Sequence, residues 1–422
     1  MHRETLPSNA GQSAADARLR IFDSRRGWQL GALVPAFFVI VVIIWVGNSW
    51  REIVTGDHDA LAIDFTVFWS AAKLAFAGDP VAAFDPDNLA AVHGVQGDFW
   101  MPWLYPPGFM LAILPLGAFS FPVAWVIFIG LSSLAMLAAV RPFAGGVTPV
   151  WIGFGFAPAT FPALIVGQTS VLWIACLLAA LAALRGGRPV MAGVLIGFLT
   201  LKPQLGLLIP VALLACFAWR TVVSAAVTTI LLAAISTFIM GVDYWIEMNS
   251  LAQHHFERIR DAAIETHKMT SVYSVLAGIG FPEPWALSAQ WTTTALAAAT
   301  IAVAWSNPKI EFDLRAATLL LGIMVSSPYF WHYETAILAP ASLFLLRAGV
   351  LTESRFGLLL AALMWLGLAP AIAILLLTDI SFLSVRFFFA PVALAAIVVC
   401  VTALVRRIRS PFPAPFASQE NP

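Results

Sequence analysis

The sequence predicts an all-α, polytopic membrane protein, and three observations support this fold class. Hydrophobic residues make up 60% of the 422 residues and charged residues 11%, whereas soluble domains carry about 25% charged residues. Apolar segments of membrane length recur along the chain. Short links rich in arginine and lysine alternate with longer polar stretches, which is typical of a chain that crosses a membrane repeatedly. The net charge is zero, so the total charge says nothing about partners. We expect substrates and membrane lipids as partners, and no nucleic acid.

The first membrane helix is predicted at residues 28–50, where Trp28 and Trp50 suit the two interfaces. Arginines precede it, at positions 18, 20, 25 and 26, so the positive-inside rule puts the amino terminus in the cytoplasm. Residues 1–27 and the proline-rich tail 410–422 are predicted to be disordered cytoplasmic segments. Residues 28–409 are predicted to form a single membrane domain.

Residues 51–104 are then expected to form a loop on the periplasmic side, and this loop is rich in acidic residues. Within it, apolar residues repeat at helical spacing: Phe65, Phe68, Trp69, Ala72 and Phe76. The pattern predicts an amphipathic helix over 64–77, which Gly78-Asp79-Pro80 ends. We expect this helix to lie along the membrane interface, with Asp64 in its first turn, where the helix dipole favours a carboxylate.

The remaining apolar segments predict about twelve crossings in total, with both termini in the cytoplasm. Residues 105–141 contain four prolines and form one broken span or two, with a net single crossing. A second polar loop is expected at 241–270. The other predicted spans cover 149–166, 170–184, 190–219 (two short helices that meet at Lys202-Pro203-Gln204), 221–240, 285–305, 316–328, 335–347, 357–377 and 384–405.

Asp64 is the leading candidate for catalysis. Partial burial beside aromatic residues raises the pKa of a carboxyl toward the range useful to a general base. The alternative is a helix cap without chemistry. Asp57 and Asp59 form an Asp-x-Asp pair that is able to bind a divalent metal, but without a third ligand we interpret them as solvated loop charges and expect no metal.

Further polar residues fall on the same predicted side of the membrane as Asp64. Lys202, in an apolar stretch and followed by a proline, suits a phosphate, with snorkelling to the interface as the alternative. His332 and Glu334 begin a span after Ser326-Ser327-Pro328, amid aromatics that also fit an interfacial belt. Arg258 lies in a cluster suited either to an anionic headgroup or to internal ion pairs. Gln168 is a weaker candidate, with a hydrogen bond at a helix break as its alternative.

Several short motifs occur in an order that resembles glycosyltransferase family 87, the GT-C type mannosyltransferases that use a polyprenyl-phosphate-mannose donor. They span about residues 30–405: Asp64-Phe65-x-x-Phe68-Trp69, Tyr105-Pro106-Pro107, Gly167-Gln168, Lys202-Pro203-Gln204 and Ser327-Pro328 with His332-Tyr333. The resemblance implies a GT-C fold, Asp64 as the catalytic base, and Lys202 and His332 near the donor phosphate. A first-loop acidic pair is common in GT-C enzymes, so Asp57 and Asp59 stay alternatives for the base.

We therefore expect a membrane glycosyltransferase that moves a hexose, with mannose as the expected sugar, from a polyprenyl phosphate to a hydroxyl of a glycolipid or glycan. The expected reaction is a direct displacement with inversion that needs no cofactor. Tyr105, Gln168, Lys202, Arg258, His332 and Glu334 are the expected substrate-binding residues. Localisation is expected in the cell inner membrane, with the active site facing the periplasm. The alternative is a transporter or flippase of lipid-linked sugars.

Overall fold

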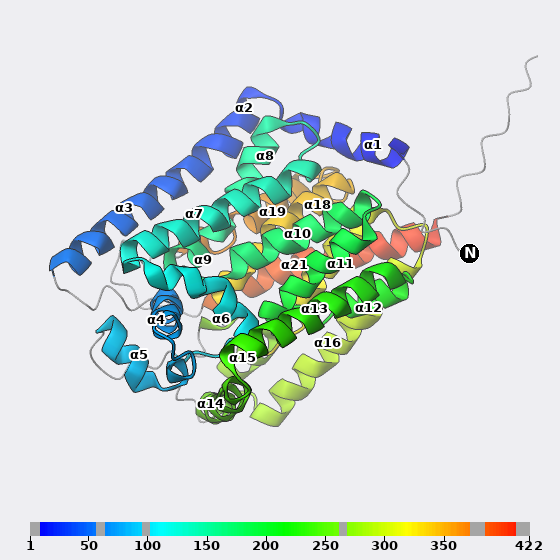
Figure 1. Cartoon of the computed structure of the whole chain (residues 1–422). Coiled ribbons are helices and arrows are strands. Elements are labelled where there is room, and N and C mark those ends of the chain that lie inside the picture. Colours follow the sequence, from blue (N-terminus) through cyan, green and yellow to red (C-terminus); the bar gives the residue numbers. More distant parts are fainter. Residues whose placement is uncertain (1–8, 56–63, 95–101, 261–267, 372–384, 411–422) are drawn as a thin grey trace, which may run out of the picture.

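The structure is a computed structural model that describes residues 9–55, 64–94, 102–260, 268–371 and 385–410 (Figure 1). Over these ranges the chain is helical, and strand-like pairing is limited to an isolated bridge between Met269 and Trp331. This agrees with the all-α fold class predicted from the sequence. Asp57 and Asp59, together with the tail after Ser410, lie outside the described residues.

The first half of the chain contains α1 (Asn9–Leu19), α2 (Arg25–Trp28), α3 (Val34–Thr55), α4 (Asp64–Phe76), α5 (Pro86–His93), α6 (Pro107–Ile113), α7 (Phe121–Val140), α8 (Thr148–Gly155), α9 (Phe161–Val166), α10 (Ser170–Arg185), α11 (Pro189–Phe198), α12 (Ile209–Ala215) and α13 (Trp219–Met240). The second half contains α14 (Asp243–Arg260), α15 (Val272–Gly278), α16 (Glu283–Ser306), α17 (Phe312–Met324), α18 (Leu338–Arg347), α19 (Arg355–Leu366) and α21 (Val385–Arg409). Among the short 3₁₀ turns, η4 (Val81–Phe84), η5 (Leu114–Ala118), η8 (Leu199–Leu201), η9 (Pro203–Leu205) and η11 (His332–Ile337) matter below.

Five helical segments of the described chain are long and apolar enough to cross a membrane: Arg25–Trp45, Phe121–Phe143, Thr148–Val166, Trp219–Met240 and Phe389–Arg409. Shorter apolar helices accompany them, at Pro107–Ala118, Ser170–Arg185, Pro189–Leu201 and Arg355–Leu366. The protein is therefore an all-helical membrane protein with several membrane-length segments. The total of about twelve crossings and their orientation stay predictions.

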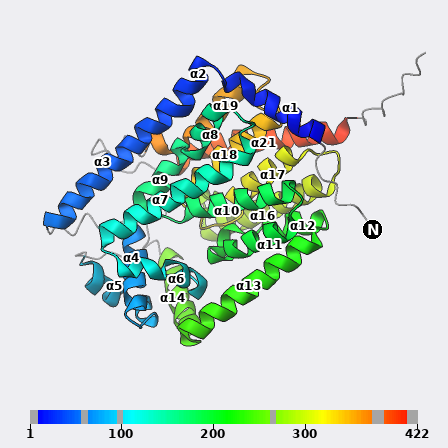
Figure 2. The same cartoon turned by 45° about the horizontal axis from the view of Figure 1, so that its top comes forward.

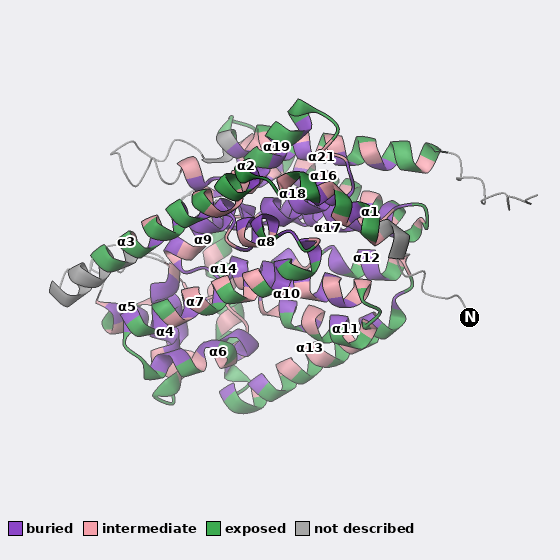
Figure 3. Ribbon diagram, turned by 90° about the horizontal axis from the view of Figure 1, so that it is seen from above, coloured by how far each residue is buried: buried purple, intermediate pink, exposed green. Residues whose placement is uncertain are grey.

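Burial separates the central helices from the peripheral ones (Figure 3). All ten residues of α18 are buried, and eleven of the thirteen in α17 are buried beside it. By contrast, the most apolar stretch of α13 is only 11% buried, and α3 and α13 lie at the margins of the molecule in Figure 2. Apolar surface of this extent is what lipid covers in a membrane protein.

Residues 9–27 differ from their prediction, because α1 and α2 lie where disorder was expected, whereas residues 1–8 lie outside the described chain. The guanidinium of Arg347, which is buried, binds Asp16 of α1 at 2.7 Å and Asp313 of α17 at 2.8 Å. It also donates to the Phe143 carbonyl at 2.8 Å, while Arg18 donates to the Arg347 carbonyl at 2.6 Å. We call these five residues the Arg347 cluster. Polar composition alone misled the prediction, since the partners that order α1 lie far away in the sequence.

The helix predicted at 64–77 is present as α4, and its apolar face packs against protein, while its expected position along the membrane interface stays a prediction. Seven of its thirteen residues are buried in protein. The ring of Phe65 packs 5.2 Å from that of Phe128, and the ring of Phe68 packs 5.3 Å from that of Phe109. Further along the helix, a Cβ at Gly117 of η5 would lie 2.3 Å from the Ala72 carbonyl. The apolar face of α4 thus meets α6, α7 and η5, because an apolar stripe fits protein as well as lipid.

Proline residues break three apolar stretches. The breaks within 105–141 and at Lys202-Pro203-Gln204 agree with the prediction, whereas 149–166 was expected as one unbroken span. Residues 105–141 form the short pair α6 and η5, of seven and five residues, and then α7. The short pair reaches about 20 Å, less than the roughly 30 Å of a hydrocarbon core, so α7 is the membrane-length part. Similarly, α8 and α9 flank Pro158, and α11 and α12 flank Lys202 and Pro203. These breaks leave polar residues inside the helical bundle.

Candidate active site

A left-handed turn after α9 brings the Gly167–Gln168 segment against the start of α4. Gly167 has a φ of +67°, and a Cβ at this position would lie 2.4 Å from the Cβ of Phe65. Both the backbone conformation and the close approach therefore require glycine. Because Phe65 follows Asp64 directly, the turn sets Gln168 beside the first residue of α4.

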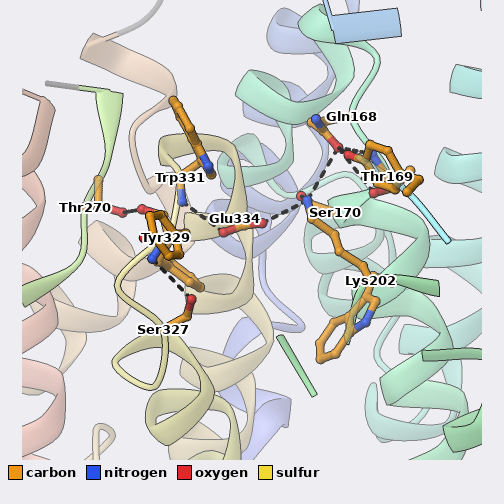
Figure 4. A network of polar contacts seen from close by, with 12 residues as sticks. Gln168, Thr169, Ser170, Lys202, Thr270, Ser327, Tyr329, Trp331 and Glu334 are labelled. Carbon is orange, nitrogen blue, oxygen red and sulfur yellow. Dashed lines mark hydrogen bonds and ion pairs between the residues drawn. The ribbon is translucent and has the colours of Figure 1, made fainter. Parts of the chain in front are cut away.

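The Lys202 side chain lies in the break between η8 and η9, where Pro203 interrupts the helical hydrogen bonds. The ammonium is buried and forms an ion pair of 2.8 Å with Glu334 of η11. It also lies 3.4 Å from Gln168 Oε1 and 3.4 Å from Ser170 Oγ (Figure 4). The ring of Tyr333 has its centroid 5.1 Å from the ammonium, which gives a cation–π contact. Lys202 is thus held inside the protein and does not snorkel.

Glu334 is fixed by the local structure of η11 as well as by Lys202. Its Oε2 accepts a 2.9 Å hydrogen bond from the backbone N–H of Trp331, which is the residue before η11 begins. The carboxylate therefore bridges a helix start and a buried ammonium (Figure 4). Its neighbour His332 is buried as well, with its ring 4.9 Å from that of Tyr333. Of the two predicted residues, Glu334 makes the direct contact with Lys202.

Gln168 joins the cluster to the segment before α6. Its Oε1 accepts a hydrogen bond of 3.2 Å from the Tyr105 hydroxyl and one of 2.9 Å from the Thr169 backbone N–H. The backbone carbonyl of Tyr105 in turn accepts from the Tyr244 hydroxyl of α14 at 3.0 Å. Tyr105 thus lies in the same cluster as Gln168, and α14 contacts it through Tyr244. Its expected role in substrate binding stays a prediction.

Asp64 is the second carboxylate of this site, beside Glu334, and begins α4, outside the membrane-length segments. Loss of hydration in the protein interior raises the pKa of its carboxyl to about 6. The cations of Lys202 and Lys268 and a hydrogen bond with the Gln168 side chain oppose this effect, whereas Glu334 adds to it. A carboxylate in this setting is mostly ionised at neutral pH and still accepts a proton readily.

Lys268 lies near the site because the two residues after it pair with the segment before η11. Thr270 donates its backbone N–H to the Phe330 carbonyl at 2.7 Å, and the Met269–Trp331 bridge lies next to it. The field of Lys268 then acts on Asp64. Arg258 lies in the last turn of α14, but its side chain is outside the described atoms, so its expected role stays a prediction.

Comparison with protein families supplies the identification. The model for glycosyltransferase family 87 matches residues 103–328, slightly more than half of the chain. The chain belongs to glycosyltransferase family 87. It is therefore a membrane glycosyltransferase, of the hexosyltransferase type. No curated protein and no solved structure matches the chain.

The family 87 match covers part of the candidate site directly. Tyr105, Gln168 and Lys202 lie inside residues 103–328, whereas Asp64 and Glu334 lie outside them. The structure brings all five together from segments that are far apart in the sequence. Among the described residues, no group of three His, Cys, Asp or Glu side chains could hold a metal ion.

Three members of this family 87 site were not selected from the sequence. Ser170 is a buried hydrogen-bond partner of Lys202, Tyr333 stacks against the ammonium, and Lys268 acts on Asp64. Tyr333 is one of the aromatics after Pro328 that fit an interfacial belt, and Lys268 is one of several cations in the cluster that contains Arg258, at residues 254–268. In the sequence, Lys268 differs from the other cations by its place at the end of that cluster; its pairing with the segment before η11 is visible in the structure.

Proposed function

We propose that the protein transfers a hexose, with mannose as the expected sugar, from a polyprenyl-phosphate donor to a hydroxyl of a glycolipid or glycan. One observation carries this proposal: a carboxylate with a raised pKa, Asp64, lies in the same buried cluster as the cation Lys202 and under the field of Lys268. Such a cluster suits a base for the acceptor and cations for a departing phosphate.

In the proposed step, Asp64 takes the proton of the acceptor hydroxyl while the hydroxyl oxygen attacks the anomeric carbon. The bond between that carbon and the phosphate oxygen breaks, and the phosphate leaves with the bonding electrons. Attack on the face opposite the phosphate inverts the anomeric configuration. A positioned general base contributes roughly 10²- to 10⁴-fold to the rate.

The leaving phosphate gains negative charge, and a buried ammonium stabilises that charge strongly in a site of low dielectric. Lys202 is buried, with an exposed side-chain fraction of 5%. Glu334 keeps it in place before the donor binds, and His332, on the same short helix, supplies a further donor toward the phosphate. The polyprenyl tail explains why the enzyme is made of membrane helices.

We further propose that residues 28–409 form one catalytic domain of GT-C type in the cell inner membrane. The arginine-rich links support a cytoplasmic amino terminus and a site that opens to the periplasm. The donor lipid and the acceptor would then meet on the periplasmic side, together with membrane lipids.

The test is sugar transfer in membranes that contain the wild type or Asp64→Asn in equal amounts. Radiolabelled polyprenyl-phosphate-mannose and a lipid extract are supplied, and labelled products are separated. We expect the wild type to label a glycolipid and Asp64→Asn to lose at least 100-fold of that rate. Equal labelling by both proteins would make Asp64 a helix cap. Movement of labelled lipid between leaflets without any transfer would support the transporter alternative.

A further inference from the structure

The side-chain oxygen of Gln168 has more hydrogen-bond donors around it than it has lone pairs. It accepts from the Tyr105 hydroxyl at 3.2 Å, from the Thr169 backbone N–H at 2.9 Å and from the Thr169 hydroxyl at 3.2 Å. The Lys202 ammonium adds a fourth contact at 3.4 Å. An amide oxygen offers two lone pairs, so Gln168 Oε1 has no capacity left for a substrate.

These donors also fix which way the amide points. A backbone N–H and an ammonium donate only, so the atom that faces them is the oxygen and not the nitrogen. The Gln168 NH₂ group is consequently directed away from Thr169 and Lys202. The close approach of Gly167 to Phe65 puts this amide beside Asp64, the first residue of α4, and the Gln168 side chain lowers the pKa of the Asp64 carboxyl.

We propose that Gln168 is a positioning residue for the Asp64 base and not a substrate-binding residue as its motif suggested. Its oxygen is held by Tyr105, Thr169 and Lys202, and its NH₂ group holds one carboxylate oxygen of Asp64. The other carboxylate oxygen is then free to take the acceptor proton. This assignment rests on the proposed function of Asp64.

The ionisable groups around Asp64 determine what loss of this hydrogen bond does. Lys202 and Lys268 favour the carboxylate, whereas Glu334 opposes it. The hydroxyls of Tyr105, in the segment before α6, and of Tyr333, in η11, also interact with Asp64. A hydrogen bond to the charged form lowers the pKa of a carboxyl. Without Gln168, the activity of the base is therefore expected to require a higher pH.

The experiment measures initial transfer rates from pH 5 to pH 8 for the wild type, Gln168→Leu and Gln168→Glu. We expect the acidic limb to move up by about one pH unit in Gln168→Leu, and further in Gln168→Glu, which sets a second carboxylate beside Asp64. A substrate-binding role predicts instead a higher KM for the donor with an unmoved limb. Gln290→Leu is the matched control, because Gln290 is equally buried and bonds Tyr273, Thr294 and Val325.

A spectroscopic titration separates this inference from the proposed function. The infrared band of the protonated Asp64 carboxyl is identified by its absence in Asp64→Asn and is followed against pH in each variant. If the wild type transfers no sugar, the proposed function fails, and the band still decides whether Gln168 sets the titration of Asp64. A band that titrates at the same pH in the wild type, Gln168→Leu and Gln290→Leu would overturn the inference.

Discussion

At the scale of single residues, the raised pKa of the Asp64 carboxyl favours its proposed activity as a base but lowers the stability of the folded protein. Its pKa of about 6 in the folded protein lies above the ordinary value of 3.8 for this carboxyl. The folded state thus binds this proton more tightly than the unfolded chain does. Ionisation of Asp64 therefore costs folding free energy as the pH rises from about 4 to above 6.

From this we predict that Asp64→Asn raises the stability of the protein at pH 7.5 although it abolishes transfer. The gain should be about 1–2 kcal/mol, after a discount for the partial exposure of the side chain. It should shrink as the pH falls through 6 and vanish near pH 4. Thermal unfolding midpoints in detergent check this, with Asp87→Asn on the surface of α5 as the control. A lower midpoint for Asp64→Asn at pH 7.5 would contradict the argument.

The buried pair of Lys202 and Glu334 allows a structural role to be separated from a catalytic one. Lys202→Met or Glu334→Gln alone leaves its partner unpaired, which costs about 3–5 kcal/mol. The double variant removes both charges, so we expect most of the lost stability to return. Transfer activity should stay absent in the double variant, since the cation for the phosphate is missing. If the double variant recovered activity together with stability, the pair of Lys202 and Glu334 would have only a structural role.

At the scale of elements, α1 is held by the Arg347 cluster and not by its own helical tendency. Arg347→Ala should destabilise the protein by about 3–5 kcal/mol, because Asp313 then stays buried without a partner. Asp16→Asn should cost only about 0.5–1 kcal/mol, since 42% of the Asp16 side chain is exposed. Unfolding midpoints measure this ranking. The matched control is Arg407→Gln, because the ion pair of Arg407 with Glu311 is exposed. A loss of stability in Arg407→Gln equal to that in Arg347→Ala would contradict this ranking.

The contrast between elements explains what the sequence could and could not predict. Prolines and glycines mark the breaks at 106, 167, 203 and 328, so the polar residues beside them, Gln168 and Lys202 among them, stood out. Asp64 stood out as the first carboxylate of a helix. The burial of α4 in protein could not be predicted, because an apolar stripe has the same period whether it meets lipid or protein. The docking of α1 could not be predicted either, since the hydrogen bond between Asp16 and Arg347 joins residues 331 positions apart and leaves no local sequence pattern.

At the scale of the whole molecule, the proposed site requires α1 and α5 to lie on opposite sides of the membrane. We predict that Asn88→Cys reacts with an impermeant thiol reagent in intact cells, and that Ser13→Cys reacts only after the membrane is opened. Both positions are exposed. The test uses a background in which the native cysteines, Cys176, Cys216 and Cys400, are replaced by serine. Labelling of both positions in intact cells would overturn the predicted orientation.

The Arg347 cluster also has a consequence for how the chain is made. Asp16 leaves the ribosome early, whereas its partner Arg347 is 331 residues later in the chain. The amino-terminal helix must therefore wait, undocked, while most of the helices are inserted. Nascent chains truncated before residue 347 should leave α1 open to proteases on the cytoplasmic side, and chains that extend past it should protect α1. Formation of the contact between Asp16 and Arg347 would then indicate that α18 has been inserted into the membrane.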